Sequence, residues 1–470
     1  MIAIVPKPQR VRLLSGKQYV YLPTEYHRFI EEGHGQEGYR LLIDNDGVKM
    51  YSGTPEGFFR AETTLKQLLH NKKLPNIEVW DYPLFPYRGF MLDCARHFFS
   101  VATIKKQLQA MALLKLNYFH WHLTDDQGWR IESERYPLLN KVGSHRAQTK
   151  FDGKPVSGYY TKADIQEIVN FAKSLYIEVV PEIDVPGHMS AALAAYPELS
   201  CDGEQTAVSE KFGIHKNVLC AGKPEAVETV WKIIEETAKL FPGKYFHLGG
   251  DEAPRDKWTK CPDCSKLIKE KNLKDGDGFQ AYLINLYTER LEATGKTVIN
   301  WNDGMRSKTI SDSIVMQYWV QGKKNAAAAA VEAKNGRKMI FSPFFAYYLD
   351  YPYGMTSLKK TYSYSIGFKG VQDKSYLLGV EAPLWTEFVP NEQKLETQVY
   401  PRLAALAERA WSSVSEKHYE DFTNRLSHIN KMFDQLGIKY VTINTANPAF
   451  VEGKKAVIKF FLNALNKKQK

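Results

Sequence analysis

The sequence predicts an α/β protein built on a (β/α)8 TIM barrel, with a small N-terminal α+β domain and a C-terminal helical extension. Two observations predict the barrel. Between residues 86 and 415, eight short apolar runs alternate with longer amphipathic stretches, as β/α units do. Polar and aromatic residues follow almost every run, and in a barrel these positions meet at one mouth. Eight units favour a closed barrel over an open sheet.

The first 85 residues are expected to form the small α+β domain. Strand-forming residues fill RVRLLSGKQYVYLP, and YRLLIDNDGVKMY has the pattern of a hairpin that turns at NDG. An amphipathic helix follows in GFFRAETTLKQLLH. The proline-rich segment DYPLFPYRG, residues 81–89, marks the boundary with the barrel.

The barrel itself is expected over residues 86–415. Its candidate strands are the apolar runs 89–93, 117–123, 177–184, 245–252, 297–303, 313–319, 338–344 and 377–385. Helical periodicity lies between them, in 101–115, 161–175, 223–241, 279–295 and 394–411.

The ends of the candidate strands carry polar and aromatic side chains: Asp93, His122, Asp125, Asp184, His188, Asp251, Glu252, Trp301, Asp303, Trp319, Trp385 and Glu387. An aspartate at such a position often caps the next helix, and tryptophan is usually a core residue. Helix capping alone does not readily explain polar or aromatic residues at the ends of seven candidate strands. We therefore interpret them as one functional site at the mouth of the barrel.

Residues 416–470 are expected to form helices packed on the side of the barrel. The segment LSHINKMFDQLG is amphipathic, as such a helix would be. A helix that binds a partner is the alternative for this region.

Composition and charge exclude some classes of protein. With 44% apolar and 25% charged residues, the chain can bury a large core. The formal charge of +10 is spread along the chain except for the basic end GKKAVIKFFLNALNKKQK, so we expect no nucleic-acid partner. No apolar stretch approaches the roughly 20 residues of a membrane-spanning helix. The start, MIAIVPKPQR, lacks a signal-peptide pattern, so the chain is expected to be soluble, although a leader could have been trimmed.

Five cysteines leave the redox compartment open. The pair in KCPDCSK could be half of a zinc site, but a second pair at zinc spacing is missing, so we expect no metal. Two disulfides, Cys201 with Cys220 and Cys261 with Cys264, together with a buried Cys94, would suit export with a trimmed leader, which we favour. Five reduced thiols would suit the cytoplasm equally well.

The segment HLGGDEAP places two acids, Asp251 and Glu252, on consecutive residues. A retaining glycosidase of the usual kind needs two carboxyl groups about 5 Å apart on opposite sides of the anomeric carbon. Consecutive side chains on a strand alternate in direction, and their Cα atoms are only about 3.8 Å apart. The pair is therefore poorly placed to flank a sugar ring and well placed to contact two neighbouring substituents of it.

This arrangement suits a substrate that supplies its own nucleophile. The carbonyl oxygen of a 2-acetamido group can attack C1 while Glu252 protonates the leaving oxygen. Asp251 can then hold the acetamide N–H and balance the charge of the oxazolinium intermediate. An intramolecular nucleophile of this kind is worth roughly 7 to 11 kcal/mol.

Eight motifs occur in the order YRGFMLDCARHFF, HWHLTDDQGWR, PEIDVPGH, HLGGDEAP, NWND, QYW, YYLD and GVEAPLWTE. In this order they resemble the family 20 glycoside hydrolases, the β-N-acetylhexosaminidases, from about residue 40 to about residue 412. This family is a substrate-assisted exception to the two-carboxylate rule.

The resemblance implies a role for each matching residue. Glu252 would be the general acid and then the base, Asp251 would orient the acetamide, and Tyr348 would donate its hydroxyl to the acetamide oxygen. The pocket walls would be Trp301, Trp319 and Trp385, and the ring hydroxyls would be bound by Arg88, Asp350 and Glu387. Asp125 and His188 would support the acid pair without touching the sugar.

The sequence therefore predicts an exo-β-N-acetylhexosaminidase that releases terminal, non-reducing GlcNAc or GalNAc from oligosaccharides or glycoconjugates without a metal or organic cofactor. One alternative is a metal-dependent TIM-barrel amidohydrolase, because His120 and His122 lie two apart on one strand. Another is a catalytically inactive carbohydrate-binding barrel. The leaving group, the choice between GlcNAc and GalNAc, and the oligomeric state stay open.

Overall fold

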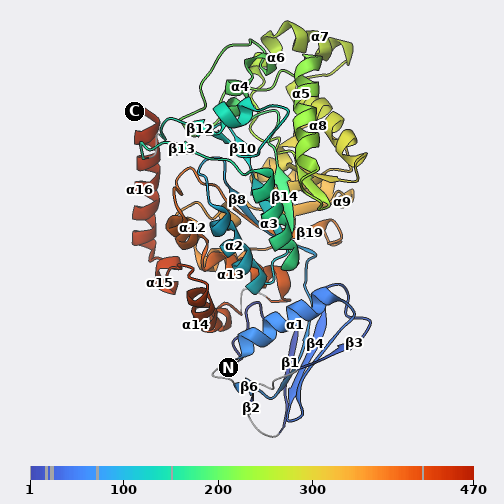
Figure 1. Ribbon diagram of the computed structural model, residues 1–470, viewed down its shortest axis with the longest axis vertical. Helices are drawn as coiled ribbons and strands as arrows, with labels where there is room; N and C mark the ends of the chain where they lie inside the picture. The colour runs from blue at the N-terminus through green and yellow to red at the C-terminus, as the bar shows by residue number, and fades with distance from the viewer. Residues whose placement is uncertain are drawn as a thin grey trace.

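The computed structural model describes residues 2–15, 19–21, 26–69, 73–149, 152–414 and 418–469 (Figure 1). A small N-terminal domain lies at one end of a (β/α)8 barrel, and the last helix runs along the flank of the barrel. No helix among the described residues is both long and apolar enough to cross a membrane. The predicted boundary between residues 415 and 416 lies outside the described residues.

The N-terminal domain is a five-stranded sheet with one helix packed on it. The strand order is β1-β7-β4-β5-β3, with β1 Arg10–Leu13, β3 His27–Ile30, β4 Tyr39–Asp44, β5 Gly47–Ser52 and β7 Ile77–Asp81. A separate pair contains β2 Tyr19–Tyr21 and β6 Lys73–Pro75. The predicted β4–β5 hairpin is present, and helix α1 Pro55–Leu68 begins where the Thr54 side chain accepts a hydrogen bond from the Gly57 amide.

The eight predicted strands close into a parallel barrel in the order β14-β15-β16-β17-β18-β19-β8-β9. They are β8 Tyr87–Asp93, β9 Tyr118–His122, β14 Glu178–Glu182, β15 Tyr245–His247, β16 Thr297–Trp301, β17 Val315–Tyr318, β18 Met339–Phe341 and β19 Leu377–Leu384. The short strands β10 Thr124–Asp125, β11 Gly128–Trp129, β12 His145–Arg146 and β13 Val156–Ser157 lie in the connections after β9. The predicted fold class is confirmed.

The helices of the barrel region alternate with its strands. They are α2 Val101–Leu113, α3 Lys162–Ser174, α4 Ser190–Ala195, α5 Pro224–Ala238, α6 Asp256–Lys260, α7 Pro262–Glu270, α8 Gly276–Glu292, α9 Lys323–Lys334, α10 Phe344–Tyr347, α11 Leu358–Ser363, α12 Glu392–Val399 and α13 Arg402–Trp411, with short turns η1 Leu139–Gly143, η2 Pro197–Leu199 and η3 Asn302–Arg306. The periodic stretch 394–411 is two helices rather than one. Pro401 separates them, because proline has no N–H to donate within a helix.

A belt of buried polar side chains crosses the interior of the barrel. This polar belt consists of His120, His122, Glu182, His247 and Glu381, all fully buried. One carboxylate, that of Glu182, lies 2.5 Å from His122 Nδ1, 3.0 Å from His120 Nε2 and 3.1 Å from His247 Nδ1. Glu381 lies 2.9 Å from the other ring nitrogen of His120. Buried charges need partners of this kind, so the belt holds itself together by mutual neutralisation.

The helices after the barrel are α14 Tyr419–Gln435, α15 Ile443–Ala446 and α16 Phe450–Gln469. Helix α14 is fixed by Arg425, which donates to Glu408 of α13 at 2.7 Å and to the carbonyl of Ile4 at 2.5 Å. Helix α16 lies along the barrel flank (Figure 1), where the ring of Phe460 packs against Tyr351 and Phe388.

Candidate active site

Two glycines shape the turn that carries the acid pair. The Gly249 backbone has φ of +60°, and a Cβ there would lie 1.9 Å from Asp184 Oδ1. A Cβ on Gly250, where φ is +88°, would lie 2.3 Å from Asn300 Nδ2. Only glycine combines this conformation with this close packing. The turn therefore presents Asp251 and Glu252 directly at the carboxyl end of β15.

Two residues at this mouth have left-handed backbones without being glycine. They are His188, with φ of 53°, and Glu252, with φ of 47°. Such conformations cost of order 1–3 kcal/mol each and cluster at functional sites, where the surrounding structure holds them. Both residues belong to the predicted site, one after β14 and one after β15.

Asp251 is buried and has one free acceptor. Its Oδ1 has no hydrogen-bond partner among the described residues, whereas its Oδ2 lies 3.7 Å from His188 Nε2. Burial, and then the negative charge of Asp251, raise the pKa of Asp184 well above its usual range, which favours the protonated form of Asp184. An unpaired carboxylate oxygen of this kind is suited to accept an N–H from a ligand.

Glu252 is the more accessible member of the pair. Burial, and then the charge of Asp251, raise its pKa to about 7, while His188 acts in the opposite direction. A carboxyl group with this pKa is half protonated at neutral pH, which is the condition for a general acid. The two acids thus differ in burial although they are consecutive residues, since Asp251 is buried and Glu252 is partly exposed.

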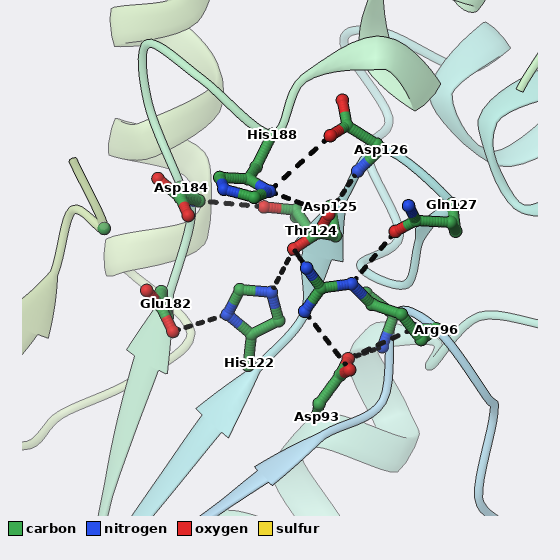
Figure 2. A network of polar contacts seen from close by, with 12 residues as sticks. Asp93, Arg96, His122, Thr124, Asp125, Asp126, Gln127, Glu182, Asp184 and His188 are labelled. Atoms are coloured by element: carbon green, nitrogen blue, oxygen red, sulfur yellow. Dashed lines mark hydrogen bonds and ion pairs between the residues drawn. The ribbon is translucent and has the colours of Figure 1, made fainter. Parts of the chain in front are cut away.

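A charged network that includes His188, Asp125 and His122 (Figure 2) lies next to the acid pair, with His188 Nε2 3.7 Å from Asp251 Oδ2. His188 Nδ1 lies 3.1 Å from Asp125 Oδ1, and Asp125 Oδ2 lies 2.8 Å from His122 Nε2. Burial alone would raise the pKa of Asp125, but Arg96 and the two histidines hold it well below its usual range. The structure therefore brings Asp125 and His188 together, as the sequence predicts, and links them to the polar belt through His122.

Four aromatic rings form a continuous arc at the mouth. The ring centroid of Trp301 lies 5.8 Å from that of Trp385, which lies 6.3 Å from that of Tyr348. Tyr348 stacks on Trp319 at 6.0 Å. Burial, and then the Asp251 charge, raise the pKa of Tyr348 well above its usual range, so its hydroxyl remains a hydrogen-bond donor. An arc of this kind offers flat apolar surfaces to a pyranose ring.

Asp350 lies close enough to Glu387 for the charge of Glu387 to affect its ionisation. Burial, and then the charge of Glu387, raise the pKa of Asp350 well above its usual range. Its Oδ1 has no hydrogen-bond partner among the described residues. Glu387 is half-buried, and burial raises its pKa although Arg96 acts in the opposite direction. These carboxyl groups add hydrogen-bonding capacity beside the aromatic arc.

Arg88 does not belong to this site, which corrects the prediction from the sequence. It is the second residue of β8, at the amino end of the strand, and it is fully buried. Its guanidinium donates to Glu37 of the N-terminal domain, to Lys115 O at 2.9 Å and to Phe85 O at 2.8 Å. The substrate mouth of a barrel is at the carboxyl ends of its strands, so Arg88 serves the contact between the two domains.

The arginine at the mouth is Arg96, which the sequence reasoning missed. It follows the carboxyl end of β8 and donates to Gln127 Oε1 at 2.9 Å, with Asp125 Oδ2 at 2.8 Å (Figure 2). Its guanidinium carbon also lies 4.9 Å from the ring centroid of Trp385. The signal was present in LDCARH, because Arg96 stands after the strand end and Arg88 before it.

His120 and His122 have the surroundings of ion-pair residues. Burial lowers the pKa of each, but the neighbouring carboxylates outweigh it and raise that of His120 to about 9 and that of His122 to about 10. The amidohydrolase alternative needs both side chains as metal ligands, whereas here each is paired with buried carboxylates in the barrel interior.

Neither of the two predicted disulfides is present. All five cysteines are free thiols, and Cys201, Cys220, Cys261 and Cys264 instead meet in one cluster. The shortest separation given for their sulfurs, 3.6 Å between Cys220 and Cys264, is far beyond the S–S bond of about 2.05 Å.

A barrel whose mouth combines an acid with a pKa near 7, a buried carboxyl group and an aromatic arc is typical of a glycoside hydrolase. Residues 85–414 match the family model described as "Glycosyl hydrolase family 20, catalytic domain", and residues 5–82 match "Glycosyl hydrolase family 20, domain 2". The chain therefore belongs to glycosyl hydrolase family 20.

Known proteins of the same family resemble it over most of its length. A β-hexosaminidase of Porphyromonas gingivalis is 39% identical over 86% of this chain, and the matched part is 54% of that protein. A β-hexosaminidase of Akkermansia muciniphila is 33% identical over 90% of this chain and 89% of its own length. The crystal structure of an exo-β-N-acetylglucosaminidase from Vibrio harveyi with N-acetylglucosamine has a TM-score of 0.84 at 26% identity, covering 94% of this chain and 78% of that one. The chain thus spans about half the length of the first of these relatives.

Proposed function

We propose that this protein is an exo-acting β-N-acetylhexosaminidase that retains configuration and uses the substrate's own 2-acetamido group as nucleophile. The observation that supports this most directly is the difference between the consecutive acids. Glu252 has a pKa raised to about 7, whereas Asp251 is buried with one oxygen unpaired among the described residues. The names of the relatives agree with this activity.

In the first step, the acetamide oxygen attacks C1 as the bond from C1 to the leaving oxygen breaks. Glu252 gives its proton to that oxygen, and Asp251 accepts the acetamide N–H and balances the positive charge of the oxazolinium. Tyr348 donates its hydroxyl to the acetamide oxygen. In the second step, ionised Glu252 removes a proton from water, which attacks C1 from the face the leaving group occupied and regenerates the acetamide. The product is the β-anomer of the free sugar.

The sugar itself would rest against the aromatic arc, with Trp385 under the ring and Trp301 and Trp319 around the acetamide methyl group. Asp350 and Glu387 would bind the ring hydroxyls. Arg96 is an arginine at this mouth, and we propose it in place of Arg88 as a partner of the hydroxyls. The substrates would be oligosaccharides or glycoconjugates that end in β-linked GlcNAc or GalNAc.

The experiment that tests this function compares two chromogenic substrates, the 4-nitrophenyl β-glycosides of N-acetylglucosamine and of glucose. Cleavage of the acetamido sugar alone is expected, because glucose has no group that can attack C1. Rapid cleavage of the glucoside would mean that the protein supplies the nucleophile, and the substrate-assisted proposal would be wrong. A thiazoline analogue of the oxazolinium should inhibit much more strongly than free N-acetylglucosamine.

The dependence of kcat/KM on pH should follow the protonation of Glu252. Its pKa is raised to about 7, so the acid form dominates below that pH and disappears above it. With N,N′-diacetylchitobiose, whose leaving oxygen needs a proton, kcat/KM is expected to fall roughly tenfold per pH unit above about pH 7. Initial rates across the pH range check this, and a constant value up to pH 9 would contradict it.

Replacement of Tyr348 by phenylalanine should remove one hydrogen bond to the acetamide oxygen. Hydrogen bonds to charged groups are worth about 1.5–3 kcal/mol, so a loss of roughly 10- to 150-fold in kcat/KM is expected. Tyr351→Phe, which changes a neighbouring half-buried tyrosine, is the matched control. Equal losses in the two variants would argue against a specific role for the Tyr348 hydroxyl.

A further inference from the structure

Four cysteine side chains from three separate segments meet in one cluster. Cys201 and Cys220 flank a long connection after α4, and Cys261 and Cys264 lie at the start of α7. All four sulfur atoms lie within 4.8 Å of one another. Cys220 and Cys264 are fully buried, and Cys261 is buried as well. Cys94 is outside the cluster, where its sulfur accepts a hydrogen bond from Trp121.

The separations of the sulfur atoms match those around a tetrahedral metal ion. They are 3.8 Å for Cys201 to Cys264, 3.8 Å for Cys220 to Cys261 and 3.6 Å for Cys220 to Cys264. Zinc binds thiolates at about 2.3 Å, and the edge of a regular tetrahedron of that radius is about 3.8 Å. These sulfur–sulfur separations are too long for disulfide bonds, which are about 2.05 Å. The cluster also contains four thiols, whereas a disulfide needs only two.

The backbone brings the first two cysteines together. Ser200 and Leu219 form an antiparallel bridge, and the Cys220 amide donates to Leu199 O at 2.8 Å. Because the two chains run antiparallel, Cys201 and Cys220 lie diagonally across this bridge, and their sulfur atoms are within 4.8 Å of each other. The alignment comes from main-chain hydrogen bonds, so it does not depend on any bond between the thiols.

The second pair lies on a helix terminus that is packed against the first. Cys261 is the N-cap residue of α7, and Cys264 lies in its first turn, where the helix dipole stabilises thiolates. A Cβ on Gly222 would lie 2.2 Å from the Cys264 amide nitrogen, so the two main chains approach too closely for any side chain. Trp258 adds a hydrogen bond of 2.9 Å from its indole to Leu219 O.

We propose that Cys201, Cys220, Cys261 and Cys264 bind one Zn²⁺ ion as a structural tetrathiolate site. Four protein ligands fill the tetrahedron and leave no position for water or substrate, so the ion would have no part in the chemistry. It would instead join the connection that follows His188 to the segment that follows Glu252. Both of these loops carry residues of the candidate active site, and the zinc would fix their separation.

The direct test is the metal content of the full chain, purified without a metal-affinity tag. One zinc per chain is expected by inductively coupled plasma mass spectrometry, with release when a mercurial reagent titrates the thiols. A zinc-free chain, with five reactive thiols or with disulfides, would overturn the proposal. Iron in place of zinc would overturn the assignment of the ion.

Variants assign the metal to the cluster. Cys220→Ser and Cys264→Ser should each lose most of the zinc, whereas Cys94→Ala, a buried cysteine outside the cluster, should keep it. Exchange with Co²⁺ gives a second measurement on the unaltered protein, because tetrahedral thiolate coordination produces visible charge-transfer absorption. Zinc retained in both serine variants, or cobalt without that absorption, would contradict the site. None of these measurements depends on the proposed activity.

Discussion

Replacement of Glu252 by glutamine is expected to lower kcat/KM for N,N′-diacetylchitobiose by about 10²- to 10⁴-fold, the contribution of a positioned general acid. Glutamine keeps the size of the side chain but has no acidic proton to give. Substrate binding should remain, because the sugar is held mainly by the aromatic arc and the other carboxyl groups. Steady-state kinetics test the expected loss of kcat/KM, and calorimetry with N-acetylglucosamine tests whether sugar binding is retained.

The leaving group provides an internal control for Glu252→Gln. 4-Nitrophenolate departs without much help from an acid, so the loss with the chromogenic substrate should be much smaller than the loss with chitobiose. Glu204→Gln changes an exposed glutamate and should leave both rates near those of the unaltered protein. A Glu252→Gln enzyme within a few-fold of the original on chitobiose would refute the assignment of the acid.

Replacement of Asp251 by asparagine is expected to lower kcat by about 10²- to 10³-fold, the usual cost of losing one preorganised group that stabilises charge in the transition state. Asparagine can still accept a hydrogen bond from the acetamide N–H, but it carries no charge to balance the oxazolinium. The expected loss is therefore in kcat more than in KM.

Asp251→Asn should also move the pH profile. The Asp251 charge is one of the causes that raise the pKa of Glu252, after burial. Its removal should lower that pKa, so the decline of kcat/KM should begin at a lower pH than in the unaltered enzyme. A purely structural defect would lower the rate without changing the pH at which kcat/KM begins to fall. If both the rate and this pH are unchanged, Asp251 has no role in the mechanism.

The sequence was sufficient for the barrel because each strand is a short apolar run bounded by a helix of clear period. It was also sufficient to bring Asp251, Glu252, Tyr348 and Trp385 to one mouth, because the carboxyl ends of parallel strands share one end of the barrel. The stretch 394–411 was predicted as one helix although it contains Pro401, which separates α12 from α13 because proline has no N–H to donate within a helix.

Two further features were not predicted correctly. Arg88 was assigned from the family resemblance, although the predicted strand 89–93 already placed Arg88 before the strand and Arg96 after its carboxyl end. The cysteine cluster depends on the bridge between Ser200 and Leu219, which joins residues that periodicity does not relate. Spacing along the chain suggested two separate cysteine pairs, whereas in the structure the four thiols come from three segments and meet in one cluster.

The polar belt inside the barrel has a consequence for how this sequence can change over time. The carboxylates of Glu182 and Glu381 are paired with the imidazoles of His120 and His122, so the loss of one of these four residues leaves a buried charge uncompensated and costs about 3–5 kcal/mol. Replacing several members together by apolar residues can cost far less. A variant with one of these residues replaced is therefore expected to be much less stable than a variant in which the paired residues are replaced together. Single substitutions inside the barrel are thus expected to be disfavoured on grounds of stability, independently of catalysis.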